Sequence, residues 1–136
     1  MILIVDWPSR DVPDTLARAG YSVIVKGGPE PDNYSAYEVQ AGDVARRPLG
    51  RAPEYVDLVY CHRPLAELPD LARLAKTLGA RTVWLQSGRT AACEKDPKGC
   101  WLPDQQARDA KEMVNALGLA FVCDAYIADV VRTLTA

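Results

Sequence analysis

The stretch Gly79-Ala80-Arg81-Thr82-Val83-Trp84-Leu85-Gln86-Ser87-Gly88 decides the fold of this chain. It has the pattern of a helix end, then a buried strand, then polar residues and a glycine where the strand stops. In an open α/β sheet, ligands bind outside the carboxyl ends of the strands. Gln86, Ser87 and Gly88 therefore lie where a binding site is expected.

On either side of this stretch, predicted strands alternate with predicted helices. We expect strands over residues 1–5, 21–26, 56–61, 82–85 and 119–123, and helices over 12–19, 68–78, 104–117 and 125–134. Asp11 and Asp104 are expected to be helix N-caps. The alternation predicts a single Rossmann-like α/β domain over residues 1–136, with a doubly wound parallel sheet of about five strands.

Two segments depart from this alternation. Residues 27–55, which begin with the predicted turn Gly27-Gly28-Pro29, are rich in proline and glycine. They are expected to form a loop with one short strand near Tyr37–Gln40, and a loop of this length is usually functional or mobile. Residues 90–103 are expected to form a polar loop.

Composition excludes several classes of function. The chain has 136 residues, 49% of them hydrophobic and 25% charged, as in an ordinary globular domain. A net charge of -2 disfavours nucleic acid as the main partner. Apolar runs of about five residues cannot span a bilayer, and the first of them lacks the basic start of a signal peptide. We therefore expect a cytoplasmic protein that does not bind membranes.

Several short motifs resemble those of a known family. Val56-Asp57-Leu58-Val59, Arg63-Pro64, Gly79-Ala80, Val83-Trp84-Leu85-Gln86-Ser87-Gly88 and Phe121-Val122-Cys123-Asp124 occur in the order and at the spacing of the small CoA-binding-domain proteins. Those proteins are stand-alone relatives of the nucleotide-binding domain of the succinyl-CoA synthetase alpha subunit. The resemblance extends from about Val56 to Leu134.

The resemblance implies a function as well as a fold. It implies non-catalytic binding of CoA, an acyl-CoA or a related nucleotide, in a cleft at the carboxyl ends of the strands. The residues expected to contact this ligand follow the strands of the predicted sheet. They are Ser9, Arg10, Lys26, Gly27, His62, Arg63, Pro64, Gln86 and Gly88.

The first loop departs from the family pattern. Where the family has a glycine-containing loop, roughly Gly-Ala-Ser-Arg, this chain has Asp6-Trp7-Pro8-Ser9-Arg10. A CoA diphosphate would approach the helix N-terminus there, but Trp7 is bulky, Pro8 has no N–H and Asp6 would repel a phosphate. The departure favours an alternative, an interaction or scaffold domain that kept the fold and lost the ligand. An NAD(P)-dependent enzyme ranks last, because the Gly-x-Gly-x-x-Gly fingerprint is missing.

Several candidate residues have a structural alternative. Ser9 and Arg10 precede a helix N-terminus, which stabilises anions, but Ser9 could instead cap the helix. Gln86 is expected to hydrogen-bond either a ligand or an adjoining loop. His62 is the only histidine, so one chain cannot hold a multi-histidine metal site. No serine or cysteine nucleophile is marked to form a triad with it, and we predict neither catalytic residues nor a metal.

The remaining alternatives concern cysteines and the last strands. Cys93 and Cys100 flank a polar loop and form either a loop disulfide or two reduced surface thiols. Asp124 either caps the last helix or faces the cleft. Trp84 is expected in the core or in a subunit interface, and the second alternative would make the protein a homodimer.

Overall fold

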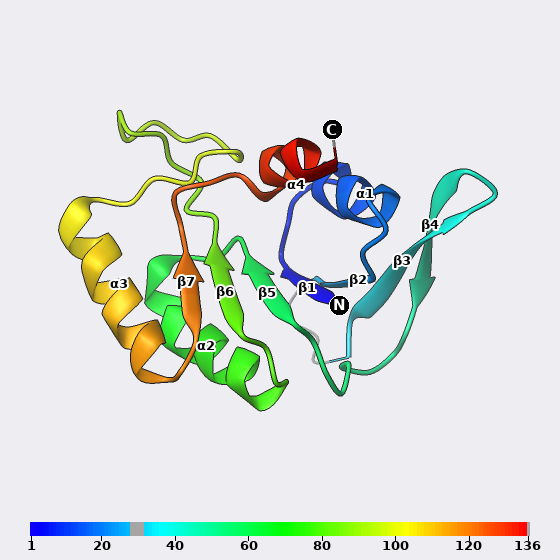
Figure 1. The fold of residues 1–136 in the computed structure, drawn as a ribbon, viewed down its shortest axis with the longest axis horizontal. Helices are drawn as coiled ribbons and strands as arrows, with labels where there is room; N and C mark the ends of the chain where they lie inside the picture. Colours follow the sequence, from blue (N-terminus) through cyan, green and yellow to red (C-terminus); the bar gives the residue numbers. More distant parts are fainter. Residues whose placement is uncertain (28–31, 136) are drawn as a thin grey trace.

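A seven-stranded sheet runs through the protein in the order β4-β3-β2-β1-β5-β6-β7 (Figure 1). The computed structural model describes residues 1–27 and 32–135. The strands from β2 to β7 in this order are parallel, which confirms the predicted Rossmann-like α/β class and its parallel sheet. They are β1 (Ile2–Val5), β2 (Val23–Lys26), β5 (Leu58–Cys61), β6 (Thr82–Leu85) and β7 (Ala120–Val122).

Helices cover both faces of this sheet. α1 (Asp11–Arg18) and α4 (Ile127–Thr135) lie together on one face, and α2 (Leu68–Thr77) and α3 (Asp104–Ala116) lie on the other (Figure 1). A short 3₁₀ turn, η1 (Leu65–Glu67), leads into α2. The predicted helices are therefore present, with ends that differ by a few residues.

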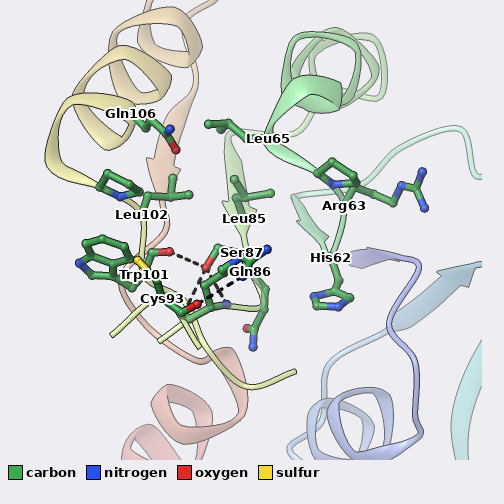
Figure 2. Close-up of a pocket in the computed structure, with 13 residues that line it drawn as sticks. His62, Arg63, Leu65, Leu85, Gln86, Ser87, Cys93, Trp101, Leu102 and Gln106 are labelled. Atoms are coloured by element: carbon green, nitrogen blue, oxygen red, sulfur yellow. Dashed lines mark hydrogen bonds between the residues drawn. The ribbon is translucent and has the colours of Figure 1, made fainter. Parts of the chain in front are cut away.

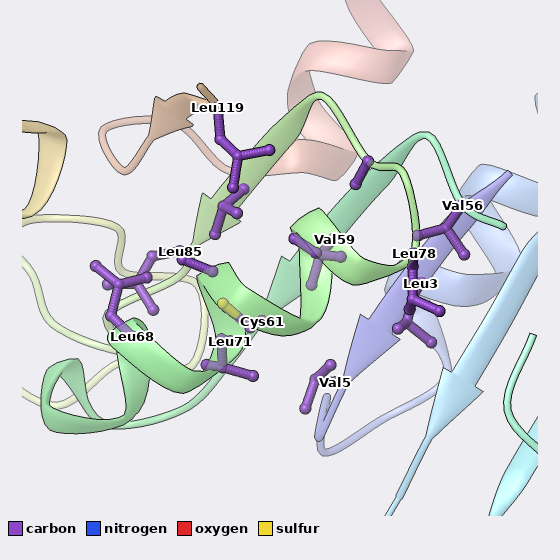
Figure 3. Packing of buried hydrophobic residues seen from close by; sticks show 14 of the residues in the cluster. Leu3, Val5, Val56, Val59, Cys61, Leu68, Leu71, Leu78, Leu85 and Leu119 are labelled. Carbon is purple, nitrogen blue, oxygen red and sulfur yellow. The ribbon is translucent and has the colours of Figure 1, made fainter. Parts of the chain in front are cut away.

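The face under α2 holds the larger part of the core. Figure 3 shows Leu3, Val59 and Leu85 on neighbouring strands, with Leu68 and Leu71 of α2 packed against them. Strands buried on both faces are expected to be continuously apolar, as β1 is. Truncating one such buried leucine costs about 2–5 kcal/mol, so this packing holds the ends of β5 and β6 in fixed positions.

A β-hairpin corrects the prediction for residues 27–55. β3 (Tyr34–Gln40) pairs antiparallel with β2, and β4 (Asp43–Pro48) pairs antiparallel with β3, so the sheet is mixed and has seven strands instead of about five. The predicted strand at Tyr37–Gln40 is the second half of β3. Ala41 and Gly42 join the two strands with φ of 53° and 86°, as tight hairpin turns require. The turn predicted at Gly28 and Pro29 lies outside the described residues.

Three aspartates differ from their predicted positions at helix ends. Asp11 and Asp104 are the first residues of α1 and α3, so Arg10 and Pro103 occupy the N-cap positions, and neither makes a side-chain capping bond. A carboxylate in the first turn still favours the helix through its dipole. Asp124 lies three residues before α4 and is exposed, so it does not cap that helix.

Candidate functional site

A cavity of about 570 Å³ opens at the carboxyl ends of β5 and β6, next to the start of α3 (Figure 2). We call it the β5–β6 cavity. Its apolar side is formed by Leu65 of η1, Leu85 of β6 and Leu102 ahead of α3, while Ser87 and Gln106 add polar groups. Figure 2 shows these side chains arranged around one space. Ligand sites typically combine such an apolar lining with a few polar groups.

Residues predicted to bind the ligand from β5 and β6 come together here. His62, Arg63, Pro64 and Gln86 all line the β5–β6 cavity. Gly88 lies beside it, because a Cβ atom at this position would be 3.0 Å from Cε1 of His62.

The residues after β1 and β2 that were predicted to bind the ligand lie elsewhere. Lys26 lines a different cavity, which it shares with Asp6 and Arg63. Ser9, Arg10 and Gly27 lie outside the lining of both cavities. The structure therefore divides the predicted site into two parts.

A carboxylate of the protein itself occupies the N-terminus of α1. Nε1 of Trp7 and Oγ of Ser9 donate hydrogen bonds to Oδ1 of Asp11, and Oη of Tyr126 donates to Oδ2 at 2.8 Å. Burial acts to raise the pKa of Asp11, but the bonds from Ser9, Trp7 and Tyr126 outweigh it and lower the pKa to about 2. Asp11 is therefore ionised at neutral pH, at the helix N-terminus where a CoA diphosphate was expected.

Arg10 is directed away from this helix end. Its guanidinium donates to the carbonyl oxygen of Val44 on β4 at 2.9 Å and lies 5.5 Å from the ring centroid of Tyr37 on β3. It also pairs with Asp14 at 3.3 Å. These contacts connect α1 to the hairpin, which is a structural role.

Two carboxylates balance the charge of Arg63. The guanidinium lies 2.8 Å from Asp6 and 2.6 Å from Glu67, and the bond to Glu67 is the main cause that raises the pKa of Arg63. Figure 2 shows the side chain pointing away from Leu85 and Leu102. Arg63 therefore borders the cavity mainly through the base of its side chain.

Gln86 is fully buried and holds the loop that follows β6. Its Oε1 accepts hydrogen bonds from Oη of Tyr60 and, at 3.3 Å, from Sγ of Cys100. Its Nε2 donates to the carbonyl oxygen of Pro97 at 2.6 Å. Of the two roles open from the sequence, Gln86 therefore takes the one toward the adjoining loop. Burial raises the pKa of Tyr60, so its hydroxyl stays protonated and remains a donor.

The same loop is joined to β6 a second time, through Ser87. Oγ of Ser87 donates to the carbonyl oxygen of Trp101 at 2.6 Å. Sequence reasoning did not single out Trp101 and Leu102 for the cavity, because the loop separates them from β6 along the chain. Only the fold of that loop brings them to the cavity.

His62 packs between two other loops at the cavity rim. Its ring lies 5.2 Å from the Trp7 ring at an interplanar angle of 74°, in an edge-to-face arrangement. Among the described residues, no group hydrogen-bonds its buried Nδ1. The imidazole therefore links the first loop to Gly88 by packing.

The alternatives for the cysteines and Trp84 are resolved. Cys93 and Cys100 are free thiols, Cys93 exposed and Cys100 half-buried. Burial raises the pKa of Cys100 to about 12. Trp84 packs against Tyr60 on the α1/α4 side of the sheet and donates from Nε1 to the carbonyl oxygen of Ala125 at 2.9 Å, so it belongs to the core.

Within residues 1–27 and 32–135, no three histidine, cysteine or acidic side chains gather as a metal would need. No helix in the same ranges has the length and apolar character to cross a bilayer.

Comparison with known proteins adds a family and a related fold. The sequence profile of a family described as CoA binding domain matches residues 5–128. A Thermus thermophilus protein of solved structure, described as "cell-free ID.343", is 24% identical with a TM-score of 0.55. The superposition covers 99% of this chain and 90% of that one, and it supports the fold alone. No curated protein matches the sequence.

Proposed function

Since the chain belongs to the CoA binding domain family, we propose that it binds CoA or an acyl-CoA, with the pantetheine arm in the β5–β6 cavity. The observation that carries this proposal is the cavity itself, about 570 Å³ at the carboxyl ends of two parallel strands. Ligands of open α/β sheets bind at these ends.

The lining of the cavity suits the chemistry of a pantetheine arm. That arm is a flexible chain with apolar methyl groups and two amides. Leu65, Leu85 and Leu102 offer apolar contacts for the chain. The side-chain amide of Gln106 is exposed and, within the described part of the protein, makes no hydrogen bond, so it is available to an amide of the ligand.

We propose binding without catalysis. His62 is the only histidine, and its ring is held by packing against Trp7 and Gly88. General base catalysis needs a hydrogen bond from the imidazole to the reacting group or to a nucleophile. The pairing of Ser87 with the carbonyl oxygen of Trp101 leaves that hydroxyl committed to the loop.

Isothermal titration calorimetry with CoA tests the proposal. Leu65→Trp should fill part of the cavity and weaken CoA binding by about tenfold or more. Val39→Trp is the matched control, because Val39 is exposed on β3, two strands or more away from β5 and β6 in the sheet. This variant should bind CoA with the affinity of the wild type. Melting temperatures measured without ligand check that both variants fold. Absence of CoA binding by the wild-type protein, or binding of NADH instead, would contradict the proposal.

An interaction domain without a ligand is the second candidate. The observation that favours it is the occupation of the α1 N-terminus by Asp11 and Trp7, where the family's diphosphate would bind. In that case no nucleotide changes the melting temperature. A dimer that forms as the protein concentration rises would then support this candidate. A homodimer and a cytoplasmic location stay predictions.

A further inference from the structure

A second cavity, of about 620 Å³, lies between α3, β7 and the loop that follows β6. We call it the α3–β7 groove. Arg108 and Lys111 line it from one face of α3, since residues three apart on a helix are neighbours. Arg89 and Lys98 line it from the loop. Four cations from two separate segments therefore meet in one groove of a protein whose net charge is -2.

These four cations keep their charge available. Within the described residues, no carboxylate lies within 4.0 Å of any of them, although Asp104 and Asp124 also line the groove. The guanidinium of Arg108 donates to the neutral amide oxygen of Gln105 at 3.0 Å. That of Arg89 donates to a backbone carbonyl oxygen at 3.3 Å. Both keep further N–H donors for an anion.

Aromatic side chains line the groove together with these cations. Trp101, Phe121 and Tyr126 line the groove from three different segments. Nζ of Lys98 lies 5.9 Å from the ring centroid of Tyr126. Cations beside aromatic rings suit a ligand that carries both phosphate groups and a planar base, because the base stacks on the rings.

The groove and the β5–β6 cavity are neighbours with a common wall. Arg89, Trp101 and Leu102 line both of them. The hydrogen bond from Ser87 to the carbonyl oxygen of Trp101 fixes this wall to the end of β6. The two spaces therefore lie next to each other, with these residues between them.

We infer that the α3–β7 groove binds the phosphorylated nucleotide end of the ligand whose pantetheine arm occupies the β5–β6 cavity. This inference rests on the proposed function. It assigns the phosphates to Arg89, Lys98, Arg108 and Lys111, which all line the groove. The ionised Asp11 carboxylate at the α1 N-terminus repels phosphate, whereas the groove attracts it.

Calorimetry with three probes tests this assignment. The probes are CoA, pantetheine and adenosine 3′,5′-bisphosphate, and the variant is Arg108→Glu combined with Lys111→Glu. Both side chains are exposed, so the helix should fold normally. We expect the double variant to bind CoA and the bisphosphate about tenfold or more weakly, with unchanged binding of pantetheine. Lys76→Glu on the exposed side of α2 is the matched control and should bind all three as the wild type does.

Each outcome separates the inference from the proposed function. If the double variant binds CoA as tightly as the wild type, the inference is wrong and the proposed function stands. If Lys76→Glu weakens the binding of CoA and the bisphosphate as much as the double variant does, the inference is also wrong, because the change in net charge alone would then explain the weaker binding. If the wild type binds neither CoA nor pantetheine, the proposed function is wrong and the inference falls with it; bisphosphate binding that the double variant weakens would then mark the groove as a separate nucleotide site.

Discussion

Asp11→Asn should destabilise the protein, because this variant removes the charge that three side chains share. In the wild type, Trp7, Ser9 and Tyr126 all donate to the Asp11 carboxylate. An asparagine keeps one acceptor oxygen, but a neutral amide forms weaker hydrogen bonds than a carboxylate. The contact to Tyr126 also joins α1 to the segment before α4, so the loss affects the docking of two helices.

The size of the effect follows from the pKa. A decrease from 3.8 to about 2 corresponds to about 2.5 kcal/mol of stabilisation. Asp11 is only half-buried, and solvent screening reduces this figure to about 1–1.5 kcal/mol. For a domain of this size, the melting temperature should then fall by about 3–6 °C.

The same pKa fixes the pH dependence. Because folding depresses the pKa of Asp11, its stabilisation is present above pH 3.8 and is lost as the pH falls to about 2. Urea unfolding followed by tryptophan fluorescence should show the deficit of Asp11→Asn at pH 7 and a smaller deficit below pH 3. Asp14→Asn, in the same helical turn, is the control and should cost less than about 0.5 kcal/mol. Equal losses in the two variants, or a deficit that is independent of pH, would refute the reasoning.

Three further predictions concern the loop after β6. Gln86→Ala leaves the buried hydroxyl of Tyr60 without its acceptor and should lower the free energy of unfolding by about 2–4 kcal/mol in urea titrations; a loss below about 0.5 kcal/mol would contradict it. Gly88→Ala should weaken CoA binding and lower the stability, because φ of Gly88 is 72° and the new Cβ would be 3.0 Å from Cε1 of His62. A CoA affinity by calorimetry equal to that of the wild type would contradict this prediction. Iodoacetamide at pH 8 should alkylate exposed Cys93 about tenfold or more faster than half-buried Cys100, whose pKa is raised to about 12; peptide mass spectrometry showing equal rates would argue against it.

The parallel part of the fold could be predicted because its signals are local. Thr82–Leu85 is a strand with the bounds that the apolar run predicted, and Gly79, with φ of 76°, follows the helix before it. The hairpin was missed because β4 is an exposed edge strand that carries Arg46 and Arg47 and has no apolar alternation. Its pairing with β3 depends on a two-residue turn at Ala41, a residue rarely found with positive φ.

The candidate site could be predicted only for residues that come directly after a strand in the sequence. His62 and Gln86 were placed at the strand ends of one cleft, and both line the β5–β6 cavity. The partners of Asp11 could not be predicted, because Tyr126 is 115 residues away and meets it only after α4 docks on α1. The α3–β7 groove was missed for the same reason, since its cations come from a loop and a helix that the sequence pattern does not pair.

The backbone amide resonances of the labelled protein, followed by NMR during titration with CoA, test the central claim most directly. The account predicts saturable shift changes at Ser87–Trp101 and along the first two turns of α3, with little change at residues 8–14. Shift changes concentrated at the N-terminus of α1, or no changes at saturating CoA, would contradict it.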